Sequence, residues 1–339
     1  MLLLRSIFVR IVGAIPVLLL VALGIFVLLR LAPGDAATVM ASNDASEADI
    51  ARLREQWGLD KSMPSQFGLF LYNVLRFDFG VSYRYGEPVT SLIGARLPAT
   101  IELASLALLM AIIIAVPLGI IMALNKARFL DTLGSFIAIA GVSAPHFWIG
   151  ILLVLLLSAH LDLLPSGGRL PFGAAIQDRT GFVLLDSLMQ GQFTTFKLAI
   201  LHLIQPALTL ALGMIGIIAR VTRSSIIDVG QEEFLFTAAA KGLTRSQITR
   251  DHMLPNAAIP IATIIGLELG VLISGSIVVE VVFSWPGLGS LLYQAVTVRD
   301  IPLTMGVVIT YTTLFIAMNI LVDIAYILID PRLRTGKAL

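Results

Sequence analysis

The sequence contains no cysteine and few charged residues. Without cysteine the chain has no disulfide bond, no thiolate metal site and no cysteine nucleophile. Asp, Glu, Lys and Arg make up only 13% of the residues, against about 25% in soluble domains. The net charge of +1 gives no reason to expect nucleic acid or an acidic substrate as a partner. Hydrophobic residues make up 57% of the chain, which is typical of a membrane protein.

About six segments are long and apolar enough to be transmembrane helices, which need about 20 residues. They are Ile11–Leu29, Leu103–Asn125, Thr132–Ala159, Leu198–Ala219, Met253–Val279 and Ile301–Val322. Arg30 directly follows the first segment and no small-x-small cleavage site is recognisable, so we expect a retained helix rather than a secretory signal. The predicted fold class is an all-α integral membrane protein.

The distribution of Lys and Arg predicts that both termini are cytoplasmic, because cytoplasmic loops are enriched in these residues. The short loop with Lys126 and Arg128 and the tail with Arg332, Arg334 and Lys337 are the better evidence for this orientation. The predicted parts are an N-terminal transmembrane helix (1–31), a periplasmic segment (32–98), a core of five transmembrane helices (99–329) with a large cytoplasmic loop (222–256), and a cytoplasmic tail (330–339).

Two further external segments have distinct compositions. Segment 160–197 begins with many Gly and Pro residues, and we expect it to be irregular. Segment 280–300 contains Trp285-Pro286-Gly287, which predicts a tight turn. Trp285 also fits an aromatic belt at the membrane interface.

Small residues recur at four-residue spacing in two spans. Ala107, Ala111, Ala115, Gly119 and Ala123 form one such face, and Gly266, Gly270 and Ser274 form another. Small residues let membrane helices approach closely. Packing within this chain and an interface with another subunit are both compatible with the pattern.

The large cytoplasmic loop carries strong helix signals. Gln231–Lys241 is rich in helix-forming residues, and Gly242 suits the left-handed conformation that ends a helix. Thr244 and Gln247 form a capping-box pattern for a second helix, and Pro255 marks the return into the membrane. The sequence therefore predicts a short helical elbow. It is either a docking element for a cytosolic partner or a helix on the membrane surface.

This loop resembles the EAA loop of binding-protein-dependent ABC importer permeases. In that pattern Glu-Ala-Ala is followed by three residues, Gly, nine residues and Ile-x-Leu-Pro. The positions kept at this spacing are Ala238, Gly242, Leu254 and Pro255. The positions that differ are Phe236, Thr237 and His252, where the family has Glu, Ala and Ile. Departures of this kind resemble the dipeptide/oligopeptide permease branch.

Other motifs along the chain are similar to the same branch. They are Pro33-Gly34-Asp35, Leu97-Pro98-Ala99-Thr100, Arg223-Ser224-Ser225, Ala240-Lys241-Gly242-Leu243-Thr244, Phe283-Ser284-Trp285-Pro286-Gly287-Leu288-Gly289 and Asp330-Pro331-Arg332. The resemblance therefore covers nearly the whole chain, and the run that begins at Phe283 is its most specific part.

The resemblance implies the six-helix type I ABC importer permease fold and a multi-pass transport subunit of the bacterial inner membrane with no catalytic residue of its own. It implies three kinds of partner: a homologous second permease, two cytosolic ABC ATPases that bind ATP and Mg, and a periplasmic or lipid-anchored substrate-binding protein. This chain would hold no cofactor and no metal. The implied cargo is a dipeptide or oligopeptide, with nickel or glutathione as the alternative. The implied ATPase-coupling residues are Thr237, Ala238, Ala239, Lys241, Gly242, Leu243, Thr244, Leu254 and Pro255.

The sequence itself fits a need for partners. It lacks the G-x-x-x-x-G-K-[ST] phosphate-binding loop of an ATPase, because Gly336-Lys337 is followed by Ala338. Energy for uphill transport must therefore come from another chain or from an ion gradient. An ion-coupled secondary transporter is the rival class. Such proteins often have inverted repeats and several charges in the membrane, and neither is clear in this sequence.

Four residues are candidates for the transport pathway or its gate. Glu268 is the one charged residue in the spans, and burying its charge would cost about 2.5–3.5 kcal/mol. It either lines a pathway or is a buried, hydrogen-bonded or protonated group. His146, beside Pro145, either faces a cavity or is structural. Glu280 and Trp285 are either interfacial or part of a gate.

Overall fold

The computed structural model describes residues 2–31, 46–48, 51, 61–174 and 176–329. In these ranges the chain is helical, with one isolated β-bridge between Val81 and Pro88. The motifs Pro33-Gly34-Asp35 and Asp330-Pro331-Arg332 lie outside the described residues. Within the described part, five helices are long and apolar enough to cross a membrane, and a bent helix pair makes a sixth if it is counted as one span.

The helices follow one another with short connections at most junctions. Their bounds are α1 Leu2–Leu31, α4 Met63–Leu75, α5 Val89–Leu124, α6 Phe129–Ser143, α7 His146–Leu153, the π-helix η1 Val154–His160, α8 Val183–Met189, α9 Phe193–Val229, α10 Glu233–Ala240, α11 Arg245–Gln247, the π-helix η2 Ile248–Met253, α12 Leu254–Val282, α13 Leu288–Thr297 and α14 Ile301–Ile329.

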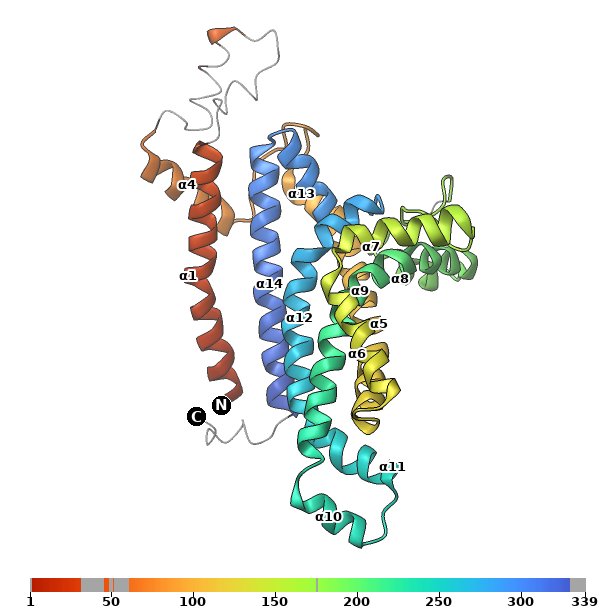
Figure 1. Ribbon diagram of the computed structural model, residues 1–339. Helices are drawn as coiled ribbons and strands as arrows, with labels where there is room; N and C mark the ends of the chain where they lie inside the picture. The colour runs from red at the N-terminus through yellow and green to blue at the C-terminus, as the bar shows by residue number, and fades with distance from the viewer. Residues whose placement is uncertain (1, 32–45, 49–50, 52–60, 175, 330–339) are drawn as a thin grey trace.

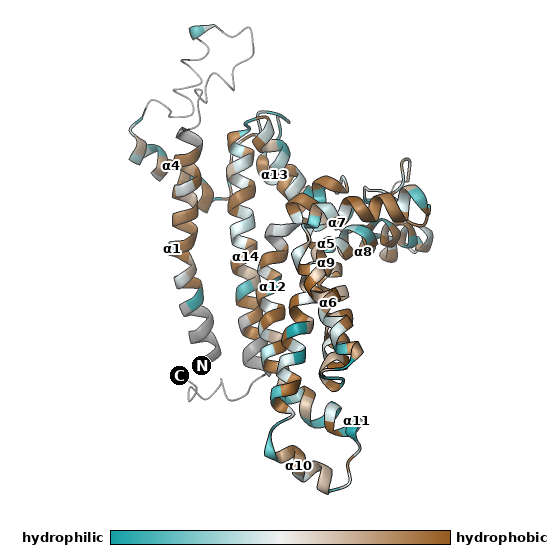
Figure 2. Cartoon of the chain, viewed as in Figure 1, coloured by the Kyte–Doolittle hydropathy of each residue, from teal (hydrophilic) through white to brown (hydrophobic). Residues whose placement is uncertain are grey.

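The long helices form a bundle. Helix α1 packs on α14, α14 on α12, α12 on α9 and α9 on α5 (Figure 1). The loop with α10 and α11 protrudes from one end, the α10 end, and α13 lies at the opposite end, the α13 end (Figure 1). Helix α1 begins and α14 ends at the α10 end. Figure 2 shows hydrophobic residues over most of the long helices and hydrophilic residues around α11 and the lower end of α9.

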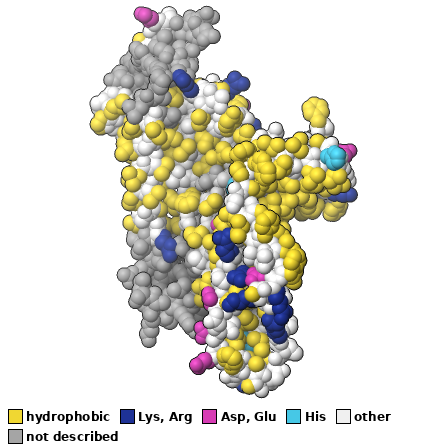
Figure 3. All heavy atoms as spheres, in the orientation of Figure 1, with side chains coloured by type: hydrophobic (Ala, Val, Ile, Leu, Met, Phe, Trp, Pro, Cys, Tyr) yellow, Lys and Arg dark blue, Asp and Glu magenta, His cyan; other side chains and the backbone are white. Residues whose placement is uncertain are grey.

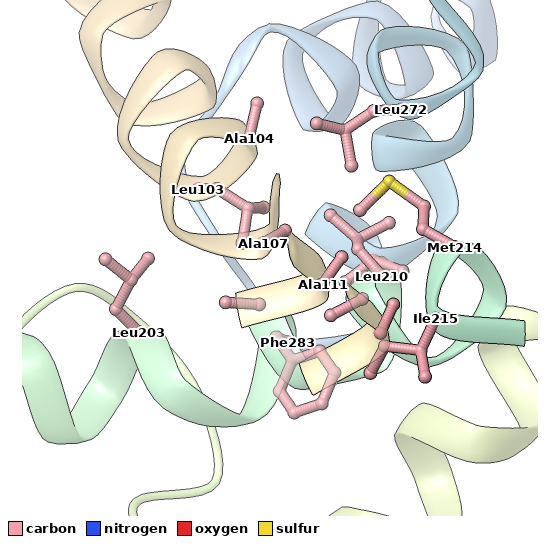
Figure 4. Packing of buried hydrophobic residues seen from close by; sticks show 14 of the residues in the cluster. Leu103, Ala104, Ala107, Ala111, Leu203, Leu210, Met214, Ile215, Leu272 and Phe283 are labelled. Atoms are coloured by element: carbon pink, nitrogen blue, oxygen red, sulfur yellow. The ribbon is translucent and has the colours of Figure 1, made fainter. Parts of the chain in front are cut away.

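The main core lies between α5 and α9. Ala107, Ala111 and Ala115 on α5 are completely buried and belong to the same cluster as Leu210 and Met214 on α9 (Figure 4). Small side chains at four-residue spacing allow two helix backbones to approach closely. The interpretation of this face as packing within the chain is confirmed.

The two glycines of the second small-residue face also pack within the chain, whereas the side chain of Ser274 lies outside what the structure describes. Gly270 of α12 faces α14, and a Cβ at this position would lie 2.7 Å from Cε2 of Phe315. Gly266 is buried as well. No other subunit is therefore needed to cover these glycines.

The predicted continuous helix over Thr132–Ala159 is wrong. Helix α6 ends at Ser143, α7 begins at His146, and the two directions differ by 106°. Proline disfavours the helical conformation of the residue before it, and Ala144 indeed has extended backbone angles. As a result α7 and η1 project sideways near the α13 end (Figure 1).

Two other expectations about element bounds need correction. Helix α5 begins at Val89, well before the predicted start at Leu103. Segment 160–197 is irregular only in its first half, because it contains α8 and the start of α9. Its irregular half is fixed to the bundle by a hydrogen bond from Gly168 N to Phe283 O (2.8 Å).

Candidate functional site

A glycine turn shapes the α10 loop (residues 230–253). Helix α10 ends in a Schellman motif, in which Leu243 N–H donates to Ala238 O (3.4 Å) and Gly242 N–H donates to Ala239 O (2.9 Å). Gly242 has φ +82°, a left-handed conformation that glycine adopts without strain. The predicted helix end at Gly242 is confirmed.

The return toward the bundle begins at Thr244. Its side-chain oxygen accepts from Gln247 N (3.4 Å), and Gln247 Oε1 accepts from Thr244 N (2.8 Å), which completes a capping box. The helical path then runs from α11 through η2 into α12, with Pro255 in the first turn of α12. The predicted cap and the predicted return at Pro255 are confirmed.

Helix α10 has a buried face and an exposed face. Leu235 and Ala238 are buried, whereas Phe236 is 71% exposed and Phe234 is also exposed. Of the predicted coupling residues, Ala238 is buried and Leu243 and Leu254 are half-buried. The exposed ones are Thr237, Ala239, Lys241, Gly242, Thr244 and Pro255. Large exposed aromatic side chains on a protruding loop are typical of a binding surface.

Two arginines connect this region to the turn between α5 and α6. Arg245 Nη2 donates to Leu124 O (3.0 Å) at the end of α5. Arg223 of α9 donates from Nε and Nη2 to the two carboxylate oxygens of Asp131 at 2.6 and 2.8 Å. Asp131 also accepts from Ala127 N (2.9 Å). Bidentate pairing of this kind fixes orientation as well as distance. Arg245 therefore ties the α10 loop to α5, and Arg223 ties the neighbouring end of α9 to α6.

A cavity of about 100 Å³ lies between α9, α12 and the break after α6. Glu268 of α12 and His146 of α7 both line it. Glu268 is 6% exposed. His146 lies against Gly213 of α9, where a Cβ would be 2.8 Å from the imidazole Nε2. Two of the four pathway candidates thus meet in one cavity, and the interpretation of His146 as cavity-facing is confirmed.

The other two candidates lie at the α13 end and are buried. The Glu280 carboxylate accepts from Thr100 Oγ1 and from Ser290 N, both at 2.9 Å, at the N-terminus of α13. Trp285 Nε1 donates to Ala99 O (2.9 Å). Both side chains are buried where the turn after α12 folds back onto α5, so Trp285 is not on the exposed surface where an aromatic belt would lie. The position of both residues relative to the membrane interface stays a prediction. A gate role for either residue stays a prediction.

Sequence reasoning missed an ion pair near this turn. Arg169, in the loop after η1, pairs with Glu102 of α5 and also donates to Gly181 O (3.0 Å). Glu102 accepts from Leu184 N (2.8 Å) as well. The Arg169 guanidinium lies 5.8 Å from the ring centroid of Trp285. The one available signal was a glutamate directly before the predicted span that begins at Leu103, where a charge close to the membrane needs a partner.

The sequence also matches known families. Residues 115–335 match the model for the binding-protein-dependent transport system inner membrane component, and residues 3–104 match the model for the N-terminal part of such a membrane component. The chain belongs to this family. The permease is therefore a multi-pass component of the bacterial inner membrane.

Named relatives of the permease cover nearly its full length. It is 40% identical over 312 residues to the "Probable D,D-dipeptide transport system permease protein DdpB" of Escherichia coli (strain K12), with 92% of each chain covered. It is 36% identical over 327 residues to the "Dipeptide transport system permease protein DppB" of the same organism, with 95% of this chain and 96% of the relative covered.

A solved structure shares the fold of the permease. A chain of the MetNI methionine ABC transporter, in an inward-facing conformation, superimposes with a TM-score of 0.54. The match covers 70% of this chain and 96% of the other, at 16% sequence identity. The membrane fold of an ABC transporter chain is therefore present here.

Proposed function

We propose that this chain is a permease subunit of an ATP-driven importer of dipeptides or oligopeptides. The names of its relatives support the cargo class, since two of them are dipeptide transport system permeases. The exposed α10 loop is the observation that carries the proposal. It supplies an apolar docking surface at one end of a membrane bundle whose sequence has no nucleotide-binding loop of its own.

The α10 loop seats in a cleft of one ATPase and transmits its closure. Phe236 and the exposed residues around it make the contact. Movement then passes through η2 into α12, because these helices are continuous. Glu268 is 14 residues beyond Leu254, the first residue of α12, which places it roughly 21 Å along the helix. A displacement of the loop thus reaches the cavity along one continuous helical path.

The α10 end faces the cytoplasm in this proposal. Lys and Arg side chains gather near this end on the face shown in Figure 3, while hydrophobic side chains cover the middle of the bundle. Because cytoplasmic loops are enriched in Lys and Arg, this distribution supports the orientation. Both ends of the chain then lie in the cytoplasm, and the α13 end receives a periplasmic or lipid-anchored substrate-binding protein.

A homologous second permease completes the translocation pathway. Helix α12 presents an exposed apolar stripe that includes Leu267, Val271 and Val278. Val271 also lines the Glu268 cavity, so a subunit packed on this stripe would enclose the cavity between the two permeases. Alternating access would follow when ATP binding closes the two ATPases, which hold ATP and Mg, and α12 and α14 change their tilt.

Reconstitution tests the proposal. The chain is assembled in proteoliposomes with its second permease and ATPases, the binding protein is added, and uptake of a radiolabelled dipeptide is measured with and without ATP. We expect uptake that requires ATP and the binding protein. Uptake driven by a proton or sodium gradient without ATP would refute the importer assignment. Nickel or glutathione transported in place of the dipeptide would refute the cargo assignment alone.

A matched pair of variants tests docking at the α10 loop. Phe236→Ser removes an aromatic side chain that is 71% exposed on α10, and Phe193→Ser removes one of equal exposure at the opposite end. We expect Phe236→Ser to reduce copurification of the ATPase subunits and Phe193→Ser to leave it unchanged. Equal behaviour of the two variants would contradict the docking role.

A further inference from the structure

The cavity between α9 and α12 combines an apolar lining with two ionisable side chains. Apolar residues such as Leu210, Met214 and Val271 form most of its wall, and the titratable groups are Glu268 and His146. In the part of the chain that the structure describes, no group of three or more potential metal ligands is found. The cavity therefore has the chemistry of a site for one small charged group and lacks that of a metal centre.

The carboxyl of Glu268 differs from every other buried carboxyl that the structure describes. The others accept hydrogen bonds from side chains or backbone N–H groups; they are Glu102, Asp131, Asp186, Glu280 and Asp300. Among the described residues, no hydrogen bond or ion pair joins the Glu268 carboxyl to another group. Because the Glu268 side chain lines the cavity, its carboxylate is available to a group that enters from outside the chain.

The size of the cavity limits what that group is. A volume of about 100 Å³ leaves room for several water molecules. A primary ammonium group with the first carbons attached to it fits this space, and the rest of a dipeptide would extend through the open side of the cavity. A negatively charged group is disfavoured by the carboxylate.

The surrounding helices keep this space open. Gly213 leaves room for the imidazole of His146, which would otherwise be displaced by a side chain. Gly275 lines the cavity about two turns beyond Glu268, and a Cβ there would meet no atom within 4 Å. The unprotonated imidazole nitrogen is a second acceptor for an N–H donor.

We propose that the Glu268–His146 cavity is an ammonium subsite that holds the N-terminal amino group of a peptide as it passes through the membrane. This inference rests on the proposed import of peptides. The carboxylate of Glu268 pairs with the ammonium group, and the apolar wall contacts the adjoining carbons. The remainder of the peptide lies toward the second permease, beyond the exposed Val271.

The absence of cysteine allows a direct test of the charge in the cavity. In the complete transporter, Val271→Cys is labelled with methanethiosulfonate reagents that carry an amino or a sulfonate group, and the mass of this chain gives each rate. We expect the cationic reagent to react faster, and Glu268→Gln to lower the ratio of the two rates about tenfold. The ratio at Ser246→Cys, an exposed position on α11, should not change.

Two labelling results would overturn the subsite. A ratio that is the same with Glu268 and with Gln at this position would mean that the carboxyl presents no charge to the cavity. No reaction of Val271→Cys with either reagent would mean that water-soluble solutes do not enter.

Transport by the same complexes completes the test. Glu268→Gln should lower the maximal rate of dipeptide uptake about tenfold, the effect of one charged hydrogen bond, while the binding protein keeps its affinity for the peptide. Glu268→Asp retains the charge and should restore part of the rate. Normal uptake by Glu268→Gln would refute the ammonium subsite and leave the proposed peptide import unaffected. Failure of uptake by the wild-type complex would instead refute the proposed peptide import.

Discussion

The turn at Gly242 gives a graded test of how the α10 loop couples to transport. In Gly242→Ala the new Cβ meets no atom within 4 Å, so the penalty is the left-handed φ alone, about 1–2 kcal/mol. Asn tolerates this region better and should be perturbed less. Proline fixes φ near about −65° and removes an N–H. It therefore forbids the observed φ of +82° and breaks the hydrogen bond to Ala239 O.

These penalties convert into an expected order of coupling. A penalty of about 1–2 kcal/mol lowers the population of the native turn roughly 5- to 30-fold relative to its alternatives. The number of dipeptides imported per ATP hydrolysed should therefore fall in the order Gly, Asn, Ala, Pro at position 242. The assay measures uptake and phosphate release on the same proteoliposomes, with the amounts of permease and bound ATPase determined in parallel.

The chain offers a matched control for this series. Gly191 ends α8 with φ +69°, and a Cβ there also meets no atom within 4 Å. Gly191→Ala has the same kind of backbone penalty at a site away from the α10 loop. Normal coupling in Gly242→Pro, or equal losses at both glycines, would refute the reasoning.

Three further predictions concern stability. Gly287→Ala should lower the Tm of the purified permease, since its Cβ would lie 2.5 Å from the Glu280 carboxylate and overpacking costs about 1–3 kcal/mol. Asp131→Asn should lower the Tm because it weakens a bidentate pair worth about 1.5–3 kcal/mol per charged hydrogen bond. Burial acts to raise the pKa of Asp186, but hydrogen bonds, led by that from Thr180, outweigh it and lower the pKa. The stability that ionised Asp186 contributes to the fold is therefore fully present above its unfolded pKa of about 3.9 and is lost as pH falls through its folded pKa. The difference in Tm between the wild type and Asp186→Asn should accordingly shrink below about pH 4.

Each of these has a control or a contrary outcome. Gly275→Ala places its methyl group in open space and should keep the wild-type Tm. Asp228→Asn changes an exposed carboxyl near the α10 end and should have little effect. A Tm difference for Asp186→Asn that stays constant from pH 7 to pH 3 would show that the hydrogen bonds do not stabilise its ionised form.

Local signals in the sequence were sufficient to predict the α10 loop. A glycine after a helix-forming run and a capping pair three residues apart act within one turn of backbone. The conformations of Gly242, Thr244 and Gln247 therefore follow from the local sequence alone. The small-residue face of α5 was equally readable, because its four-residue period follows from helix geometry.

Contacts between distant segments were not predictable in the same way. Glu280 and Thr100 are 180 residues apart, and Trp285 and Ala99 are 186 apart, so no spacing rule connects them. Hydropathy alone favoured a membrane-interface position for a tryptophan beside a turn. Pro145 indicated the break after α6. The hydropathy of an apolar segment, however, is the same whether its helix is straight or bent.

The close approach of three helix backbones restricts how this protein changes shape. A Cβ at Gly119 of α5 would lie 2.6 Å from Ala219 O of α9, and one at Gly141 of α6 would lie 2.7 Å from Leu212 O. Where backbones touch, no layer of side chains lies between the helices to slide or repack. We therefore expect α5, α6 and α9 to move as one rigid body. The conformational change that opens and closes the pathway should then occur at the contact between this rigid body and α12. Longer side chains meet there and can change rotamer.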